Sequence, residues 1–497
     1  MGDIFADDLP ALQVVVPLVT APLCLVLARW WRIVWAMCTL STWISLAIAI
    51  SLLQTVLADG TVSYAMGGWA APWGIEYRID TMNAYVALIV TGIASIVLPY
   101  AYRSAPLYLQ KDRVSLFFAL MMLCLTGLLG MTVTGDAFNV FVFLEISSLS
   151  MYGLISLGQD RRALTAAFQY LVMGTIGGTF VLLGIGFLYV VTGTLNMADL
   201  AQRLPEVTQL RTLHTAFAFL VVGIGLKLAM FPLHLWLPNA YAYAPSAATV
   251  FIAATATKVA VYILLRFVFT VIGPDIAYGD LPFGEIAMGL AVLGLLSGSF
   301  VAIFQQNIKR MLAYSSVAQI GYILLGISYA TVTGVEASLL HLFNHALMKS
   351  ALFMAMGCFF YRLRSSRLED FAGIGRIMPW TFAAFVMGGL SLIGVPLTVG
   401  FISKWYLVLA SLQEGHWILA ILILAGSLLA VIYIWRVVEA GWFASPSERA
   451  ARAREAPLSM LIPLWIIVLA NIYFGINTRL TVGVAELAAQ ALIGGGP

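Results

Sequence analysis

The sequence predicts an all-α membrane protein, a polytopic bundle of about fourteen transmembrane helices, from its composition and its hydropathy pattern. Of its 497 residues, 62% are hydrophobic and only 10% are charged, whereas a typical soluble domain has roughly 25% charged residues. The mean hydropathy is +0.96. Apolar runs long enough to cross a hydrocarbon core about 30 Å thick recur along the whole chain.

The predicted helices follow one another with short connections, in which glycine, proline and charged residues are frequent. Only the connections 56–80 and 193–212 are longer. No connection is long enough to fold as a separate soluble domain. We expect spans near residues 10–28, 33–55, 81–102, 113–133, 136–157, 163–192, 213–231, 246–272, 284–304, 309–330, 335–361, 382–412, 417–442 and 457–476.

Lysine and arginine residues of the predicted connections gather on one side of the membrane. Cytoplasmic loops carry the excess of basic residues, so we expect the N-terminus outside and, because the number of spans is even, the C-terminus outside as well. The expected location is the inner membrane of a bacterial or archaeal-type cell. The sixteen residues on the expected inner side are Arg29, Arg32, Arg103, Lys111, Arg113, Arg161, Arg162, Lys309, Arg310, Arg362, Arg364, Arg367, Arg376, Arg449, Arg452 and Arg454, and the four on the outer side are Arg78, Arg203, Arg211 and Arg479.

Six of the 26 basic residues remain, and all six fall within predicted spans. A charge at the bilayer centre costs several kcal/mol, so each of them needs a partner, water or a function. Arg436 and Glu439 lie one turn apart near the end of their helix, and we interpret them as an interfacial ion pair. The sequence does not decide the role of Arg266. The six residues are Lys227, Lys258, Arg266, Lys349, Lys404 and Arg436.

Four ionisable residues lie deeper in the membrane than the others. Glu145 follows Gly135 by ten residues, which at about 1.5 Å per residue places it roughly 15 Å deep. Lys227, Lys258 and Lys404 lie at similar depth on three other predicted helices. A purely structural set would need about as many acids, which the core lacks. Because a low-dielectric site favours the neutral amine of lysine, we interpret the four as a proton relay. The alternative is a set of charges that only lock the helices together.

Prolines predict two broken helices. Pro232 and Pro238 interrupt the chain at the seventh predicted helix, and Gly394 and Pro396 interrupt the twelfth. Broken helices in matching positions of two halves are typical of transporters built from inverted repeats. Because the breaks are five helices apart, an odd spacing that inverts topology, we expect helices 4–8 and 9–13 to form inverted five-helix repeats. The expected division is 1–112 for the first three helices, 113–272 and 273–442 for the two repeats, and 443–497 for the last helix.

Three further ionisable residues share one face of the eleventh predicted helix. His341, His345 and Lys349 are spaced at i, i+4 and i+8, which stacks them along the helix. We interpret them as part of the hydrogen-bonded relay, because histidine exchanges protons near neutral pH. No acidic or cysteine ligand lies nearby in sequence, so no metal site is expected. His234, two residues after the Pro232 break, either joins the relay or caps carbonyl groups that the break frees.

Six sequence blocks, in this order, resemble one known family. They look like the antiporter-like subunits shared by complex I and Mrp-type Na⁺/H⁺ antiporters, and the first block is most similar to the D subunit of the Mrp antiporters. A lysine at position 404 is also typical of that subunit. The blocks are GDAFNVFVFLE (Gly135–Glu145), GLKLAMFPLHLWLPNAYAYAP (Gly225–Pro245), TKVAVYILLR (Thr257–Arg266), NIKRMLAYSSVAQIGY (Asn307–Tyr322), HLFNHALMKSALF (His341–Phe353) and GVPLTVGFISKW (Gly394–Trp405).

The resemblance implies a role for each matching position. Glu145 resembles the glutamate of the fifth helix, Lys227 its partner lysine on the broken seventh helix, and Lys258 the central lysine of the eighth. Lys404 resembles the terminal ionisable residue of the broken twelfth helix, and the row on the eleventh helix resembles the linker between them. One departure is Asn239, near which the family carries an acidic residue.

We therefore expect a proton-translocating subunit of a multi-subunit cation/proton antiporter, coupled to Na⁺ export, and not an enzyme. The expected partners are other small hydrophobic membrane subunits, the lipid bilayer, H⁺ and Na⁺, without nucleic acid. One alternative is the proton-pumping membrane subunit of a complex I-like or hydrogenase-type redox complex, and another is a membrane scaffold subunit. The sequence contains no GxGxxG motif in a βαβ context, no CxxC cluster and no P-loop, so no cofactor is expected in this chain.

Overall fold

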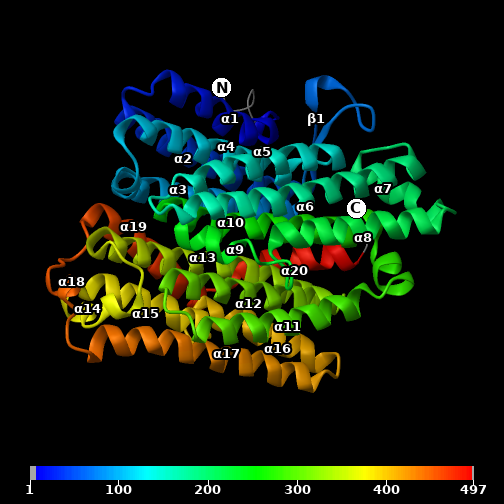
Figure 1. Cartoon of the computed structure of the whole chain (residues 1–497). Coiled ribbons are helices and arrows are strands. Elements are labelled where there is room, and N and C mark those ends of the chain that lie inside the picture. Colours follow the sequence, from blue (N-terminus) through cyan, green and yellow to red (C-terminus); the bar gives the residue numbers. More distant parts are fainter. Residues whose placement is uncertain (1–6, 495–497) are drawn as a thin grey trace.

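The computed structural model describes residues 7–494, which form a bundle of helices with roughly parallel axes (Figure 1). The ends of the chain, residues 1–6 and 495–497, lie outside the described part. Within it, thirteen helices are long and apolar enough to cross a membrane. They are α1 (Leu9–Val26), α2 (Trp31–Asp59), α3 (Thr81–Tyr108), α4 (Lys111–Val133), α5 (Ala137–Ser156), α6 (Arg162–Thr192), α8 (Leu210–Leu228), α10 (Ser246–Leu265), α11 (Phe283–Ile303), α12 (Ile308–Ser328), α13 (Val332–Leu363), α17 (Trp417–Val438) and α19 (Leu458–Ile476).

The twelfth predicted span consists of two shorter helices, α15 (Pro379–Ile393) and α16 (Val399–Gln413). The seventh span, α8, is followed by a separate short helix, α9 (Leu237–Tyr243). Pro238 lies in the first turn of α9, where its missing N–H leaves no helical hydrogen bond unmade. Pro232 and Pro396 lie in the two interruptions themselves. Both predicted breaks are therefore confirmed.

The two interruptions share the same backbone turn. Ala229 directly follows α8 with a φ of 60°, and Gly394 directly follows α15 with a φ of 94°. In both turns the next amide donates to the carbonyl oxygen five residues earlier, at 2.9 Å after Ala229 and at 3.1 Å after Gly394. The first break also frees the carbonyl oxygen of Leu226, which accepts a hydrogen bond of 2.9 Å from the indole of Trp236. Neighbouring protein thus satisfies the interrupted backbone, as a membrane interior requires.

Each half of the chain contains one backbone clip, by which we mean two short segments joined by a pair of backbone hydrogen bonds. Residues 135–137 pair with residues 195–197 through two hydrogen bonds of 2.8 Å, and residues 306–308 pair with residues 366–368 through bonds of 2.8 and 2.9 Å. The donor and acceptor of the second clip follow those of the first by the same 171 positions (137 to 308 and 195 to 366). The first clip precedes α5, the fifth span, whereas the second precedes α12, the tenth span. The clips therefore lie on opposite faces of the bundle, as inverted repeats require.

The remaining elements are short and lie at the ends of the spans. The predicted connection 56–80 contains an antiparallel hairpin, and the connection 193–212 contains α7. The π-helical segment η3 extends α10, so that this span ends at Ile272. These elements are β1 (Val62–Ala65), β2 (Glu76–Ile79), α7 (Met197–Arg203), η3 (Arg266–Ile272), η4 (Asp275–Asp280), α14 (Ile374–Ile377), η6 (Glu439–Phe443) and α18 (Glu448–Ala451), with the 3₁₀ turns η1 (Met66–Gly68), η2 (Leu204–Glu206) and η5 (Leu368–Phe371).

One helix near the C-terminus, α20 (Arg479–Ile493), was not predicted from the sequence. Its 15 residues are too few to cross the membrane. It packs against α13 and α3, and its buried residues Thr481, Val484, Ala485 and Ala488 occupy positions i, i+3, i+4 and i+7 of one helix face. The helix is therefore amphipathic, and its end lies beside the start of α3 and the end of α10.

We call the face of the bundle that carries most of the loop arginines the basic face. It is formed by the connections 27–30, 109–110, 157–161, 304–307, 364–378 and 444–457. The other face carries the β1–β2 hairpin and α7 and is called the opposite face. Between the two faces, α10 is completely surrounded by protein and packs against α13, so these two helices form the centre of the bundle.

Candidate functional site

The buried ionisable residues predicted from the sequence lie on α5, α8, α10, α13 and α16. Glu145 and Lys227 form the pair that the sequence predicts. The Lys227 ammonium nitrogen lies 3.6 Å from the Glu145 carboxylate, with exposed side-chain fractions of 6% for the lysine and 26% for the glutamate. Lys227 also donates a hydrogen bond of 2.8 Å to the hydroxyl of Ser148, which lies one turn after Glu145 on α5. The end of α8 before its break thus presents the lysine to two acceptors on one helix.

A small cavity separates the Lys227 site from α10. Its volume is about 20 Å³, and its walls include Lys227, Ser148, Ala256 and Ala260. A site of roughly 10–15 Å³ or more holds one water molecule when polar groups are present to bind it. The ammonium and hydroxyl groups supply such partners, so the cavity provides room for one bridging water between the pair and the central helix.

Lys258 lies on α10 and is buried. Its nitrogen donates to the carbonyl oxygen of Ala253 at 2.6 Å and lies 3.3 Å from the hydroxyl of Thr257. No carboxylate of the described residues lies within ion-pair distance of it. The helix that carries it, α10, packs against α13, which carries His345 and Lys349, so Lys258 lies on a helix of the first half that adjoins the second half.

The three residues on α13 form a continuous row, as their spacing predicts. The rings of His341 and His345 are stacked with centroids 6.2 Å apart. His341 lies 2.8 Å from the hydroxyl of Ser403 and 2.9 Å from the amide oxygen of Gln319. Both ring nitrogens of His345 lack a partner among the described residues. The nitrogen of Lys349 donates to Leu312 and Ser315 of α12.

Lys404 lies where the α15 helix is interrupted. Its nitrogen donates to the carbonyl oxygens of Leu392 and Ile393, at 2.9 and 2.8 Å, and to the hydroxyl of Ser427 at 2.9 Å. It also lies 4.9 Å from the centre of the Tyr322 ring. The last carbonyl groups of a helix carry partial negative charge, so the break that Pro396 accompanies exposes carbonyl oxygens that bind the Lys404 ammonium group.

Two sequence interpretations meet a different geometry, and one residue whose role the sequence left open has a partner. Arg436 and Glu439 form no ion pair. Arg436 instead lies 3.5 Å from the carbonyl oxygen of Gln305, at the end of α11. The role left open for Arg266 is an ion pair of 2.7 Å with Asp80, which holds the end of α10 to the start of α3. The ring of His234 makes no hydrogen bond to a described residue, and its Nδ1 is buried without a partner, so the proposed cap is absent.

Sequence reasoning missed one buried cation. The sequence places Lys309 among the loop residues of the basic face, but its side chain is only 2% exposed. It occupies the first turn of α12, directly after a predicted loop, where a lysine ordinarily reaches water. The hydroxyl partners Ser148, Ser315 and Ser427 were missed as well, because short polar residues are common in membrane helices and carry no distinctive sequence signal.

The arrangement joins polar groups from one half of the bundle to the other. It begins at the Glu145–Lys227 pair, passes Lys258 and the α13 row, and ends at Lys404. Among the described residues no group of three or more histidine, cysteine or acidic side chains has the geometry of a metal site. The membrane-crossing fold and this buried polar row define a polytopic subunit of an ion-transport system.

Residues 134–430 match the family described as NADH:quinone oxidoreductase/Mrp antiporter, TM, and the chain belongs to this family. It is 41% identical over 457 residues to the N subunit of the NADH-quinone oxidoreductase of Desulforudis audaxviator, covering 88% of this chain and 90% of that protein. It is 28% identical over 482 residues to the D subunit of the Na⁺/H⁺ antiporter of Bacillus subtilis, covering 97% and 96%. The predicted membership of a family shared by both kinds of complex is confirmed.

Two solved structures have the same fold. One is a chain of the Mrp complex from Dietzia, with a TM-score of 0.91, 23% identity and coverage of 99% of this chain and 98% of that one. The other belongs to the membrane-bound sulfane sulfur reductase, an archaeal respiratory membrane complex, with a TM-score of 0.90, 30% identity and coverage of 97% of both chains. Both relatives are subunits of multi-subunit membrane complexes.

Proposed function

We propose that this chain is the proton-translocating subunit of a multi-subunit cation/proton antiporter and that it moves H⁺ in exchange for Na⁺. Glu145, Lys227, Lys258, His341, His345, Lys349 and Lys404 form the relay. The repeats 113–272 and 273–442 each contribute one half of the path. The basic face is the cytoplasmic side of the inner membrane, and other hydrophobic subunits and lipid surround the bundle.

The observation that supports this function most is the shortage of counter-ions around the buried lysines. Lys227 has a carboxylate within 4 Å, whereas the nitrogen atoms of Lys258, Lys349 and Lys404 bind only carbonyl and hydroxyl oxygens of the described residues. A buried charge without a counter-ion is costly, and charges that only lock helices together would be paired. An amine that gains and releases a proton avoids this cost for part of each cycle.

The Glu145–Lys227 pair controls when Lys227 holds its proton and when it releases it. While the pair is closed, the carboxylate favours the charged form of the lysine. When the pair opens, Lys227 loses this stabilisation, and its proton can pass through the neighbouring water-sized cavity toward α10 and Lys258.

A redox-driven proton pump is the second candidate. It is favoured by the 41% identity to the N subunit of an NADH-quinone oxidoreductase and by the fold shared with a respiratory complex at 30% identity. In such an assembly the same relay would operate, but the driving chemistry would lie in partner subunits.

Purification of the native assembly in mild detergent distinguishes the two candidates. Subunit mass spectrometry and visible absorbance are measured on the same sample. Only small hydrophobic subunits, without flavin or iron–sulfur absorbance, are expected for the antiporter. A peripheral arm with redox centres would instead identify the chain as one module of a respiratory complex.

The relay itself is tested by Lys227→Ala, with Glu439→Gln as the matched control on the basic face. In membrane vesicles that contain the assembled complex, loss of a proton-transfer group should lower cation-dependent proton movement by ~10²-fold. The control should retain it, because Glu439 is exposed and pairs with no described residue. Near-normal transport in an assembled Lys227→Ala complex would favour the scaffold alternative instead.

A further inference from the structure

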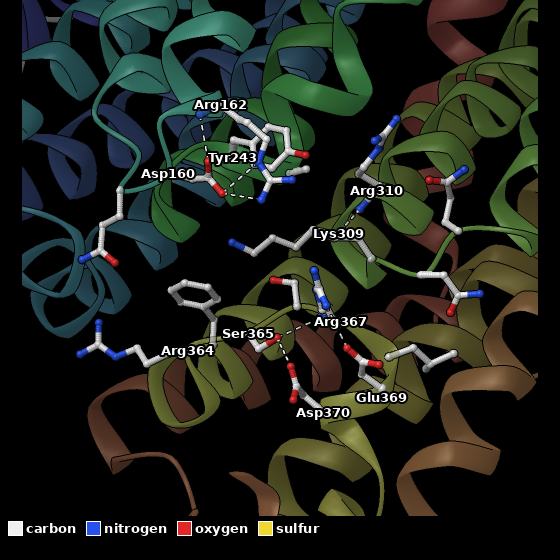
Figure 2. A pocket seen from close by; sticks show the side chains of 18 of the residues that line it. Asp160, Arg162, Tyr243, Lys309, Arg310, Arg364, Ser365, Arg367, Glu369 and Asp370 are labelled. Carbon is white, nitrogen blue, oxygen red and sulfur yellow. Dashed lines mark hydrogen bonds and ion pairs between the residues drawn. The ribbon is translucent and has the colours of Figure 1, made fainter. Parts of the chain in front are cut away.

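A large polar cavity opens on the basic face, between the two halves of the chain. Its volume is about 1090 Å³, and its walls come from the end of α3, the α5–α6 connection, α9, the start of α12 and the connection after α13. Figure 2 shows Lys309 among the side chains that line this cavity, and Lys309 itself is only 2% exposed. The relay residues do not line it.

Lys309 lines the cavity, and none of the described carboxylates lies within ion-pair distance of its nitrogen. Its nitrogen lies 3.2 Å from the hydroxyl of Ser246 and 3.5 Å from that of Tyr108. The ring of Phe360 lies beneath it, with its centre 4.8 Å from the nitrogen. Lysine carries three donors and no acceptor when charged, and these neutral partners satisfy only part of that capacity.

The carboxylates that line the cavity bind other cations. The Arg162 guanidinium, hydrogen-bonded to Asp160, holds the pKa of that carboxyl below its usual range. The acids that line the cavity are therefore bound to arginines, and none of them binds Lys309. The three pairs are Asp160 with Arg162 at 2.6 Å, Glu369 with Arg367 at 3.1 Å, and Asp370 with Arg449 at 3.6 Å.

The first turns of α12 connect Lys309 to the buried row. Lys349 donates to the carbonyl oxygen of Leu312 and to the hydroxyl of Ser315, three and six residues after Lys309 on the same helix. At a rise of about 1.5 Å per residue these positions lie roughly 5 and 9 Å deeper. On the other side of Lys309, Ser246 begins α10, the helix that carries Lys258. Lys309 thus lies between an open cavity and two relay helices.

We propose that Lys309 transfers protons between the basic face and the relay, with the cavity as its water-filled vestibule. This inference rests on the proposed function and adds its entry residue. The proton arrives from vestibule water at the Lys309 amine. It leaves toward Lys349 by way of the hydroxyl groups of Ser246 and Tyr108 and the water between them. The amine returns to its starting protonation state after each transfer.

The competing structural role is that Lys309 only anchors α12 by its charge on the Phe360 ring. Lys309→Arg distinguishes the two roles, because a guanidinium keeps the charge and the donors but does not release its proton in proteins. A proton-transfer role predicts a ~10²-fold loss of transport in the assembled Lys309→Arg complex. Transport near that of the unmodified protein would overturn the proposal.

If the Lys309→Arg variant assembles poorly, a chemical-rescue experiment distinguishes proton transfer by Lys309 from a purely structural role. Lys309→Cys is prepared as the assembled complex, whose four native cysteines are buried, and is then alkylated from the basic face. Bromoethylamine restores a titratable amine, whereas a trimethylammonium-ethyl thiol reagent restores only a fixed charge. We expect transport to return with the first reagent alone. Rescue by both reagents, or by the fixed charge alone, would refute proton transfer through this residue.

Two controls separate this inference from the proposed function. Arg452→Gln changes an exposed residue of the basic face that does not line the cavity, and it should leave transport unchanged. Lys227→Ala reports on the relay itself. If Lys227→Ala abolishes transport while Lys309→Arg does not, the relay stands and the entry residue is wrong. If neither change affects transport, the proposed function is wrong, and the inference about Lys309 is rejected with it.

Discussion

At the scale of single residues, the number of acceptors around each buried lysine differs along the row. Lys404 has three oxygen acceptors, which matches the three donors of an ammonium group. Lys258 and Lys349 have two each. The charged form is therefore best accommodated at Lys404 and at the Glu145–Lys227 pair. The centre of the row is better suited to transient protonation.

The position of the Glu145 carboxylate depends on a glycine of α6. A methyl group added at Gly178 would overlap the carboxylate, which is the end of a flexible side chain and can move away. A shift from 3.6 Å to about 6 Å would weaken its attraction to Lys227 by ~2 kcal/mol at an effective dielectric constant of about 20. We therefore expect Gly178→Ala to lower transport about tenfold in vesicles, with normal assembly.

The matched control for this change is Gly186→Ala on the same helix. A methyl group added there meets no atom within 4 Å. Alanine is favoured over glycine in a helix by ~1 kcal/mol, so both variants should fold. Equal transport by the two variants would mean that the precise position of Glu145 does not matter.

The depth of the site residues was predictable by counting along helices, because the hydrocarbon core fixes where a span begins. Glu145 and Lys404 were found in this way. Lys309 was not, because a lysine at the start of a span ordinarily extends to water, and only its packing against the rings of Tyr108 and Phe360 reveals its burial. The prediction of an Arg436–Glu439 ion pair was wrong, because Arg436 instead lies beside the carbonyl oxygen of Gln305 at the end of α11.

At the scale of elements, one ion pair joins two helices that lie far apart in the sequence. Asp80 accepts a hydrogen bond of 3.0 Å from the backbone of Asn83 and so caps α3, and its other oxygen binds Arg266 at 2.7 Å. Arg266 also lies over the ring of Tyr262. The start of α3 and the end of α10 are thereby held together beneath α20.

Loss of the arginine should weaken this junction without changing the relay. The side chains are 11% and 27% exposed, so we expect Arg266→Met to cost ~2 kcal/mol, between the values for exposed and buried pairs. The thermal midpoint of the purified assembly measures the change. Arg203→Met is the control, since Arg203 is 48% exposed in its pair with Asp199 and this pair should contribute less than ~1 kcal/mol. Equal midpoints for the two variants would contradict the structural role.

The long apolar elements were predictable, whereas the short ones were not. Hydropathy identified every span, and prolines identified both broken helices, because each signal reflects a strong constraint of the membrane interior. The hairpin β1–β2 and helices α7 and α20 lie at the faces, where water satisfies the backbone and the constraint disappears. Their positions depend on contacts with residues far away in the sequence.

At the scale of the whole molecule, two large cavities lie on opposite faces, and each is beside one of the two backbone clips. The cavity of the basic face is lined by residues of the second clip, and a cavity of about 530 Å³ on the opposite face is lined by residues of the first. Each contains a buried cation, Lys309 in one and Arg266 in the other. Lys309 has no acidic partner among the side chains that the structure describes, whereas Arg266 is bound to Asp80, so the inverted repeats present two chemically different openings to the two sides of the membrane.

The orientation of these openings can be measured directly. Arg161→Cys on the basic face and Arg211→Cys on the opposite face replace exposed residues, while the four native cysteines are buried. Because basic loops remain in the cytoplasm, a membrane-impermeant thiol reagent should label the Arg211→Cys variant in intact cells. It should label the Arg161→Cys variant only in inverted vesicles. The reverse pattern would place Lys309 and its vestibule on the outer side, where the same residue would release protons instead of accepting them from the cytoplasm.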